Sequence, residues 1–171
     1  EKGGGENLYS LPQKAENALH KARTTHTTVV NYSPLIDEDD GQIFLVEQLL
    51  RSALLNGEIT CYYQPKLDLV TNTSYEVEAL VRWDRPGETV MPPHLFFPAA
   101  KRSGLMFLLT ERVLDIALQQ TKEWRDQGMP ICMSVNITAK DLSNKKLVET
   151  VKTTLKKYNL PGNVLMLEII K

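Results

Sequence analysis

The stretch Tyr75–Trp83 reads Tyr-Glu-Val-Glu-Ala-Leu-Val-Arg-Trp and has the period-two pattern of a half-buried strand. Successive side chains of a strand point to opposite faces, so the apolar set shares one face: Val77, Ala79 and Val81. The opposite face carries Glu76, Glu78, Leu80 and Arg82. An unpaired buried carboxylate is costly, so either this face is wet or Glu78 lies beside a cation. Two cations remain open, namely Arg82 and a metal ion.

Composition places the chain among ordinary globular proteins. Its 171 residues include 20 Lys and Arg against 21 Asp and Glu, a formal net charge of -1. This balance gives no support for a DNA, RNA or membrane-surface partner. We expect no membrane segment, because no apolar run reaches the ~18 residues that a spanning helix needs. The cysteines, Cys61 and Cys132, fall in strand-like segments without metal-ligand spacing, which indicates reduced core thiols in a cytoplasmic protein.

The N-terminal quarter of the chain divides into three short segments. Residues 1–9 hold a triple glycine and the start of a common tag-cleavage site, so we exclude them from the fold as tag or linker. Residues 10–33 hold one helical pattern and one β-branched run, too little to fold alone. Residues 34–42 contain Pro34, the acidic run Asp37–Asp40 and Gly41, and we expect a linker there.

The domain proper is expected over residues 43–171. A helix over Ile43–Leu55 ends at Asn56-Gly57, and strand Ile59–Gln64 leads through the turn Thr71–Ser74 into Tyr75–Trp83. Parallel neighbours need a crossover of a dozen or more residues, so this short turn makes the first two strands antiparallel. The later order is helix, strand, helix, strand, which predicts a parallel α/β sheet: Phe107–Gln127, Ile131–Asn136, Leu147–Tyr158 and Val164–Ile170.

Polar residues at the C-terminal ends of such strands face a ligand. Glu78, Asn136 and Glu168 are therefore candidates for one cluster, and their oxygen donors suit Mg²⁺ or Mn²⁺ better than Zn²⁺. Structural alternatives remain open for each residue. Asn136 could cap a turn or helix, Glu168 could pair with a lysine at a sheet edge, Glu78 could pair with Arg82, and Gln64 could be a solvated amide.

Five linked motifs resemble the EAL domain family in order and spacing. They are Tyr62-Tyr63-Gln64-Pro65-Lys66, Glu78-Ala79-Leu80-Val81-Arg82-Trp83, Phe97-Pro98-Ala99-Ala100 with Gly104-Leu105, Val135-Asn136-Ile137-Thr138-Ala139, and Leu167-Glu168-Ile169. The resemblance covers about Gln42 to Lys171. The segment Ala15–Tyr32 resembles the last helix and strand of a GGDEF domain, the usual upstream neighbour.

The resemblance implies an α/β fold, part of a (β/α)8 TIM-type barrel with an antiparallel first strand. It also implies metal-dependent hydrolysis of cyclic di-GMP to linear pGpG in bacterial second-messenger signalling. Carried over, Glu78, Asn136 and Glu168 would bind Mg²⁺ or Mn²⁺ in a two-metal site. Gln64, Leu80 and Arg82 would contact the bound dinucleotide.

The chain also departs from the family pattern. The family's Glu-Ile-Thr-Glu reads Glu168-Ile169-Ile170-Lys171, and Lys101 stands where a glutamate is common. The family domain runs about twice as far, and its second half holds an Asp-Asp metal motif and a lysine that positions the attacking water. We therefore expect a phosphodiesterase parent and an inactive 171-residue chain without a complete catalytic set. The alternative is a degenerate, non-catalytic domain that acts as a cyclic di-GMP sensor or dimerisation module.

A half-barrel leaves unpaired strand edges, at the outer side of the first strand and of Val164–Ile170. Proteins rarely leave such edges bare. We therefore expect a homodimer or another form of self-association.

Overall fold

The computed structural model describes residues 19, 23 and 34–170, and the chain divides into two compact units, Glu1–Gln48 and Leu49–Lys171. Helix α2 (Pro34–Asn56) begins in the first unit. The second unit holds the remaining elements in the order β1 (Ile59–Asp68), β2 (Thr73–Trp83), α3 (Pro93–Arg102), α4 (Met106–Asp126), β3 (Cys132–Thr138), α5 (Ala139–Leu142), α6 (Lys146–Lys157), the 3-10 turn η2 (Gly162–Val164) and β4 (Leu165–Ile170). The expected tag, the GGDEF-like segment and Lys171 lie outside the described residues, apart from Leu19 and Arg23.

Helix α2 starts at Pro34 rather than at Ile43, so the expected linker over residues 34–42 is helical. Proline is tolerated in the first turn of a helix, where its missing N–H has no partner to lose. The acidic run Asp37–Asp40 falls within the first two turns of this helix, and acidic residues are generally favoured near helix N-termini. The predicted end is confirmed, because α2 stops at Asn56 and Gly57 takes the left-handed conformation with φ of 77°.

The four strands form one mixed sheet in the order β1-β2-β3-β4. Strands β1 and β2 are antiparallel, with Gln64 opposite Glu78, as the short turn between them predicts. Strand β2 runs parallel to β3, and β3 runs parallel to β4. The arrangement is part of the wall of a TIM-type barrel with an antiparallel first strand, which confirms the predicted fold class.

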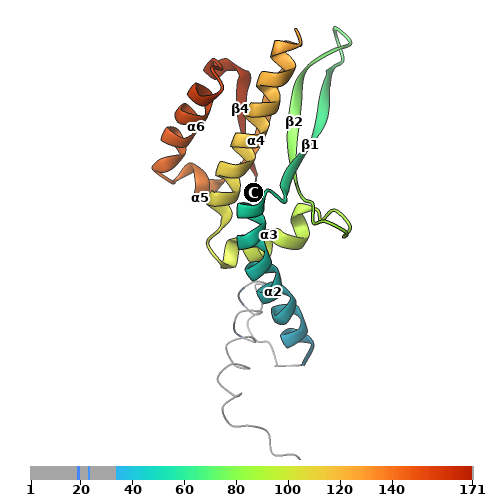
Figure 1. Ribbon diagram of the computed structural model, residues 1–171, viewed down its shortest axis with the longest axis vertical. Coiled ribbons are helices and arrows are strands. Elements are labelled where there is room, and N and C mark those ends of the chain that lie inside the picture. The colour runs from blue at the N-terminus through green and yellow to red at the C-terminus, as the bar shows by residue number, and fades with distance from the viewer. Residues whose placement is uncertain (1–18, 20–22, 24–33, 171) are drawn as a thin grey trace, which may run out of the picture. The chain divides into compact units, whose positions relative to one another are not determined.

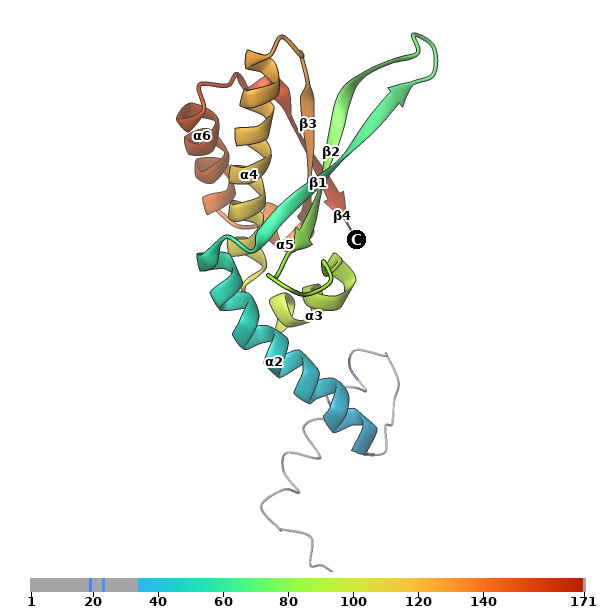
Figure 2. The same cartoon turned by 45° about the vertical axis from the view of Figure 1, so that its right-hand side comes forward.

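The helices cover one face of this sheet. Figures 1 and 2 show α4 and α6 side by side on that face. Every third or fourth residue of α4 is buried there, including Leu109, Val113 and Ala117. Helix α4 packs against β1, β2 and β3, and the buried apolar residues of the two central strands are Val77, Ala79 and Val81 of β2 and Met133, Val135 and Ile137 of β3. At about 25 cal/mol per Å², this shared burial is the main favourable term in folding the unit.

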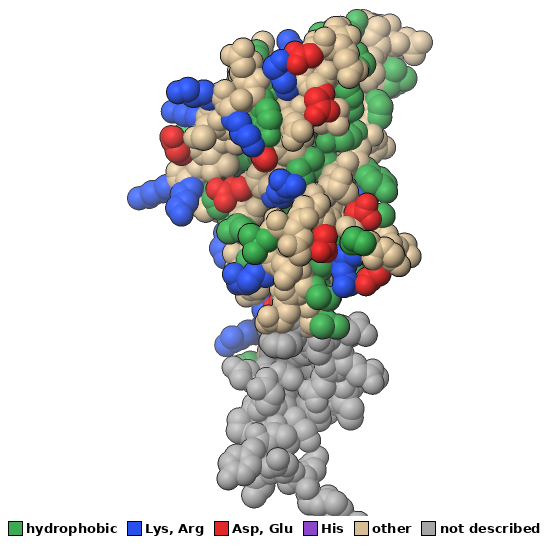
Figure 3. Space-filling model, in the orientation of Figure 1, with side chains coloured by type: hydrophobic (Ala, Val, Ile, Leu, Met, Phe, Trp, Pro, Cys, Tyr) green, Lys and Arg blue, Asp and Glu red, His purple; other side chains and the backbone are tan. Residues whose placement is uncertain are grey.

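The surface on the helix side is charged and mixed. Figure 3 shows acidic and basic side chains interspersed over it, with basic ones gathered over α6, which carries Lys146, Lys152, Lys156 and Lys157. Within the part of the chain that the structure describes, no helix is both long and apolar enough to cross a bilayer. The other face of the sheet carries the charged set of β2, and the candidate site is built there.

Candidate functional site

Glu78 and Asn136 meet on the polar face of the sheet. Asn136 lies inside β3, which continues to Thr138, so it neither ends the strand nor caps a helix. Its Nδ2 donates to Glu78 Oε1 over 2.6 Å. The bond joins neighbouring strands. It leaves Asn136 Oδ1 and the second carboxylate oxygen of Glu78 able to coordinate a cation. The structure thus pairs Glu78 with Asn136 rather than with Arg82.

Glu168 completes the convergence from β4. It is the register partner of Asn136, and its side chain lies on the same face. Its carboxylate forms an ion pair with Lys66 of β1, as the structural alternative for Glu168 anticipated, although the lysine comes from the far edge of the sheet. Lys66 Nζ also donates to Ser134 Oγ over 3.0 Å. Three candidate ligands from three adjacent strands therefore share one patch, and an ammonium group lies among them.

Electrostatics at this patch follow from the same contacts. The hydrogen bond from Lys66, with a further one from Ser134, holds the pKa of Glu168 below its usual value. The hydrogen bond to Glu168 raises the pKa of Lys66, and the charges of Glu78 and Glu76 act in the same direction. Glu168 is therefore ionised and Lys66 protonated at neutral pH, so one ammonium group already offsets part of the negative charge of the carboxylates.

Arg82 lies further along β2 on the same face. Its guanidinium stacks over the ring of Tyr62 with 5.3 Å to the ring centroid, and its NH1 donates to Val81 O over 2.8 Å. Stacking fixes the guanidinium plane and leaves its other N–H groups for an anionic oxygen. Gln64, exposed on β1 opposite Glu78, adds an amide beside this row.

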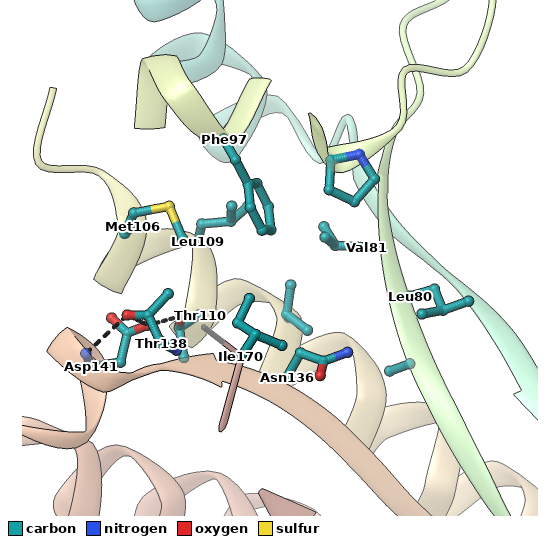
Figure 4. Close-up of a pocket in the computed structure, with 13 residues that line it drawn as sticks. Leu80, Val81, Phe97, Met106, Leu109, Thr110, Asn136, Thr138, Asp141 and Ile170 are labelled. Atoms are coloured by element: carbon teal, nitrogen blue, oxygen red, sulfur yellow. Dashed lines mark hydrogen bonds between the residues drawn. The ribbon is translucent and has the colours of Figure 1, made fainter. Parts of the chain in front are cut away.

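A cavity of about 200 Å³ opens beside Asn136, where β2 and β3 separate. Their pairing ends at Ala79 and Val135, although both strands continue beyond that point. Figure 4 shows Leu80, Asn136 and Ile170 lining the cavity on the side of the sheet, with Phe97 across from them. Its walls are mainly apolar, so this hollow suits the flat face of an aromatic group more than a phosphate.

The far end of the cavity is closed by a buried hydrogen-bond network. Asp141, only 2% exposed, accepts from the Thr138 backbone N–H at 3.0 Å, from Thr138 Oγ1 at 2.7 Å and from Thr110 Oγ1 at 3.2 Å. Thr138 and Asp141 form a capping box that starts α5 directly after β3. All three of these hydrogen bonds reach Asp141 Oδ2, so Asp141 links α4 to the end of β3 and braces the strand that carries Asn136.

The donor set suits a hard divalent cation. Glu78, Asn136 and Glu168 offer carboxylate and amide oxygens on a half-buried face, the ligand type that Mg²⁺ and Mn²⁺ prefer. Among the residues from 34 to 170, no group of three or more His, Cys, Asp or Glu side chains has metal-binding geometry. Glu78, Asn136 and Glu168 do not form such a group, because only two of the three are carboxylates and the third is an amide.

Sequence reasoning found the three converging residues but missed Lys66 and Ser134. Alternation along β1 places Lys66 on the same face as Gln64 and Tyr62, so that signal was available in the sequence. Its contact with Glu168 was not available, because it depends on how strongly the sheet curls. Lys101, the other departure, lies on α3 and lines a second hollow together with Lys140, and that hollow adjoins the first cavity at Met106, Thr138, Asp141 and Ile170.

Comparison with known proteins decides the family. The sequence pattern of the family described as "EAL domain" matches residues 47–171. The chain belongs to the EAL domain family. Relatives include the cyclic di-GMP phosphodiesterase PA2567 of Pseudomonas aeruginosa, 30% identical over 153 residues, which are 89% of this chain and 26% of that protein. The bifunctional diguanylate cyclase/cyclic di-GMP phosphodiesterase MucR of the same organism is 29% identical over 170 residues, 98% of this chain and 25% of that protein.

Solved EAL structures share the fold. The complex of the MucR phosphodiesterase with c-di-GMP superposes with a TM-score of 0.68 at 32% identity, over 72% of this chain and 50% of that chain. The Xanthomonas citri FimX EAL domain in complex with c-diGMP gives 0.70 at 26% identity, over 79% of this chain and 52% of that chain. The present chain thus spans about a quarter of these curated relatives and about half of these solved EAL chains.

Proposed function

We propose that this EAL chain supplies the first metal-binding and nucleotide-binding strands of a cyclic di-GMP phosphodiesterase that forms linear pGpG. The convergence of Glu78, Asn136 and Glu168 from three adjacent strands carries the proposal. The similarity to PA2567 and to the MucR complex supports the choice of cyclic di-GMP as substrate. Because Cys61 and Cys132 are free thiols, as is usual in a reducing compartment, we place the reaction in the bacterial cytoplasm.

Each residue of the polar face has a role in this proposal. Glu78 and Glu168 would hold Mg²⁺ or Mn²⁺, and Asn136 would add its amide oxygen while its Nδ2 orients Glu78. Bound divalent ions would neutralise the phosphodiester charge and activate water. Arg82 would donate to a phosphate oxygen from the plane that Tyr62 fixes. Gln64 would bond a nucleotide edge, and Leu80 would pack against a guanine at the mouth of the apolar cavity.

Glu78→Gln tests this proposal in the protein expressed from its complete reading frame. The change keeps the shape of the side chain and removes its charge, so Mn²⁺-dependent hydrolysis should fall by about 100-fold or more. Glu76→Gln, two residues earlier on the same face, is the matched control and should retain activity. Ion-exchange chromatography of cyclic di-GMP and pGpG gives the rates. Equal loss in both variants would contradict the assigned role of Glu78.

A second candidate is a non-catalytic EAL domain that senses cyclic di-GMP. The ion pair between Lys66 and Glu168 favours it, because an ammonium group lies where the phosphodiesterase proposal puts a metal. In that case calorimetric titration of the complete protein would show cyclic di-GMP binding that does not require Mn²⁺. The same preparation would release no pGpG. Metal-dependent release of pGpG would reject this candidate.

We further propose that the 171-residue chain alone is catalytically inactive and self-associates. Within the described sheet, β1 and β4 are the edge strands, and each has hydrogen-bonding groups on its outer side. Met166 and Ile169 of β4 are 41% and 58% exposed, which adds apolar area to that edge. Light scattering should show a mass that rises with concentration toward a dimer or larger species. A constant monomer mass over a wide concentration range would contradict self-association.

A further inference from the structure

Lys66 comes from the opposite edge of the sheet to the residue that it binds. It lies on β1, whereas Glu168 lies on β4, and two strands separate them. Neighbouring strands lie about 4.8 Å apart, so a flat sheet would hold β1 and β4 about 14 Å apart. The ion pair therefore requires a sheet curled with its polar face inside. The Lys66 side chain extends across the concave polar face of the sheet and contacts Ser134 of β3 and Glu168 of β4.

The ammonium group of Lys66 takes the position of a counter-ion for the cluster. It bonds Glu168 and Ser134, and Ser134 is the register partner of Glu78. The carboxylates of Glu78 and Glu76 also act on it electrostatically. Asp141 is buried, whereas the Lys66–Glu168 ion pair is accessible to solvent. The side chains of Lys66 and Glu168 are 33% and 32% exposed. A lysine on a flexible four-carbon stem can leave such a position for water.

We propose that Lys66 is an internal cation that offsets part of the negative charge of Glu78 and Glu168 and must leave Glu168 before a divalent ion binds. The inference rests on the proposed metal site. Like charges at contact distance repel strongly in a half-buried setting, so the ammonium group and the metal exclude one another at Glu168. Lys66 therefore lowers the affinity of the cluster for a divalent ion, and it orders Glu168 when no such ion is bound. It is a positioning residue that sets the metal concentration at which the site fills.

Removing the charge of Lys66 tests the inference directly. Electron paramagnetic resonance measures free Mn²⁺. A titration therefore gives the Mn²⁺ affinity of the 171-residue chain and of its Lys66→Met variant. An ion pair of this exposure is worth about 1 kcal/mol, so the variant should bind Mn²⁺ about fivefold more tightly. Lys122→Met is the matched control, because Lys122 also pairs with a carboxylate, Asp126, on the distant α4 surface. The Lys122→Met variant should bind Mn²⁺ with the same affinity as the unchanged chain.

A second measurement uses the unchanged chain and so does not depend on a variant that folds. Bonds to Ser134 and Glu168 should slow proton exchange of the Lys66 ammonium group and make its ¹⁵N side-chain resonance visible in NMR spectra. Saturating Mg²⁺ should remove that protection, while the other lysine resonances keep theirs. A Lys66 resonance unchanged at Mg²⁺ saturation would overturn the inference.

The outcomes separate this inference from the function on which it rests. If the unchanged chain and Lys66→Met bind Mn²⁺ equally, and Glu78→Gln weakens binding, Lys66 does not compete and the metal site stands. Weaker binding in Lys66→Met would likewise overturn the inference and would make Lys66 a support for the site. If neither form binds Mn²⁺ at millimolar concentration, the proposed metal site and the inference fail together.

Discussion

Individual residues on the polar face differ in what they could do even though they share one sheet. Glu78 and Asn136 contact each other, Glu168 contacts Lys66, and Arg82 stacks on Tyr62. From the sequence, alternation placed Glu78 and Arg82 on one face of their strand, and the expected strand ends placed Asn136 and Glu168 near Glu78. The partner of each one was not predictable, because partners come from other strands and depend on register and curl.

Arg82→Lys should separate nucleotide binding from metal binding. Lysine keeps the positive charge but loses the planar fork that binds a phosphate through two hydrogen bonds and stacks on Tyr62. We expect about a tenfold loss of cyclic di-GMP affinity by calorimetry, with Mn²⁺ affinity unchanged. Arg85→Lys is the control, since Arg85 pairs with Glu88 beyond the end of β2. Equal effects of the two changes would contradict the role given to Arg82.

The two cysteines should react at different rates. Burial raises the pKa of the Cys61 thiol to about 12, so almost no thiolate exists near neutral pH. Cys132 lies on β3 with intermediate exposure, and burial raises its pKa as well. Iodoacetamide at pH 8 should therefore label Cys132 first, and Cys61 only on unfolding, as mass spectrometry of the peptides would show. Equal labelling of the folded chain would contradict the burial of Cys61.

At the scale of helices and strands, prediction from the sequence succeeded where apolar residues recurred at one regular spacing over a whole element. The 21 residues of α4 and the 11 of β2 carry clear helical and strand patterns, and both were found near their true bounds. Helix α5 was missed because four residues are too few to show a helical period. Its one local signal was the capping pair Thr138 and Asp141. The start of α2 was missed because Gly41 and the acidic run resemble a linker, although a helix tolerates both.

Asp115 of α4 accepts two hydrogen bonds from the C-terminal end of α6. Lys157 Nζ donates to its carboxylate over 2.6 Å, and Tyr158 Oη donates over 2.9 Å. Burial alone would raise the pKa of Asp115, but these two hydrogen bonds outweigh burial and hold the pKa below its ordinary value of 3.8. The carboxylate therefore stabilises the fold above that ordinary pKa, and this stabilisation is lost as the pH falls through the lowered folded value.

Asp115→Asn should reduce the free energy of unfolding by about 1–2 kcal/mol at pH 7, because it removes a charged acceptor from two donors. The difference from the unchanged chain should shrink in acid, where Asp115 is protonated in both folded and unfolded chains. Urea unfolding followed by circular dichroism measures both values. Asp126→Asn, which breaks an exposed pair on the same helix, should change stability by less than about 0.5 kcal/mol. A difference for Asp115→Asn that stays constant in acid would refute this explanation.

At the scale of the whole molecule, the fold is an EAL half-barrel whose helices cover one face and whose candidate ligands lie on the other. The fold class was predicted from the sequence, because the order of strands and helices, the short β1–β2 turn and five spaced motifs agree with one another. The curl that carries Lys66 across to Glu168 was not predicted. Curl is set by the packing of the sheet against α4 and α6 and has no local sequence signal.

The central claim is that Glu78, Asn136 and Glu168 form one site for a divalent cation. Anomalous diffraction from crystals of the chain grown with Mn²⁺ tests it most directly, because manganese scattering locates the ion without reference to activity. We predict an anomalous peak within coordination distance of oxygens from all three residues, with Lys66 turned away from Glu168. An ordered Mn²⁺ bound elsewhere, with the Lys66–Glu168 ion pair intact and no peak at the cluster, would contradict it.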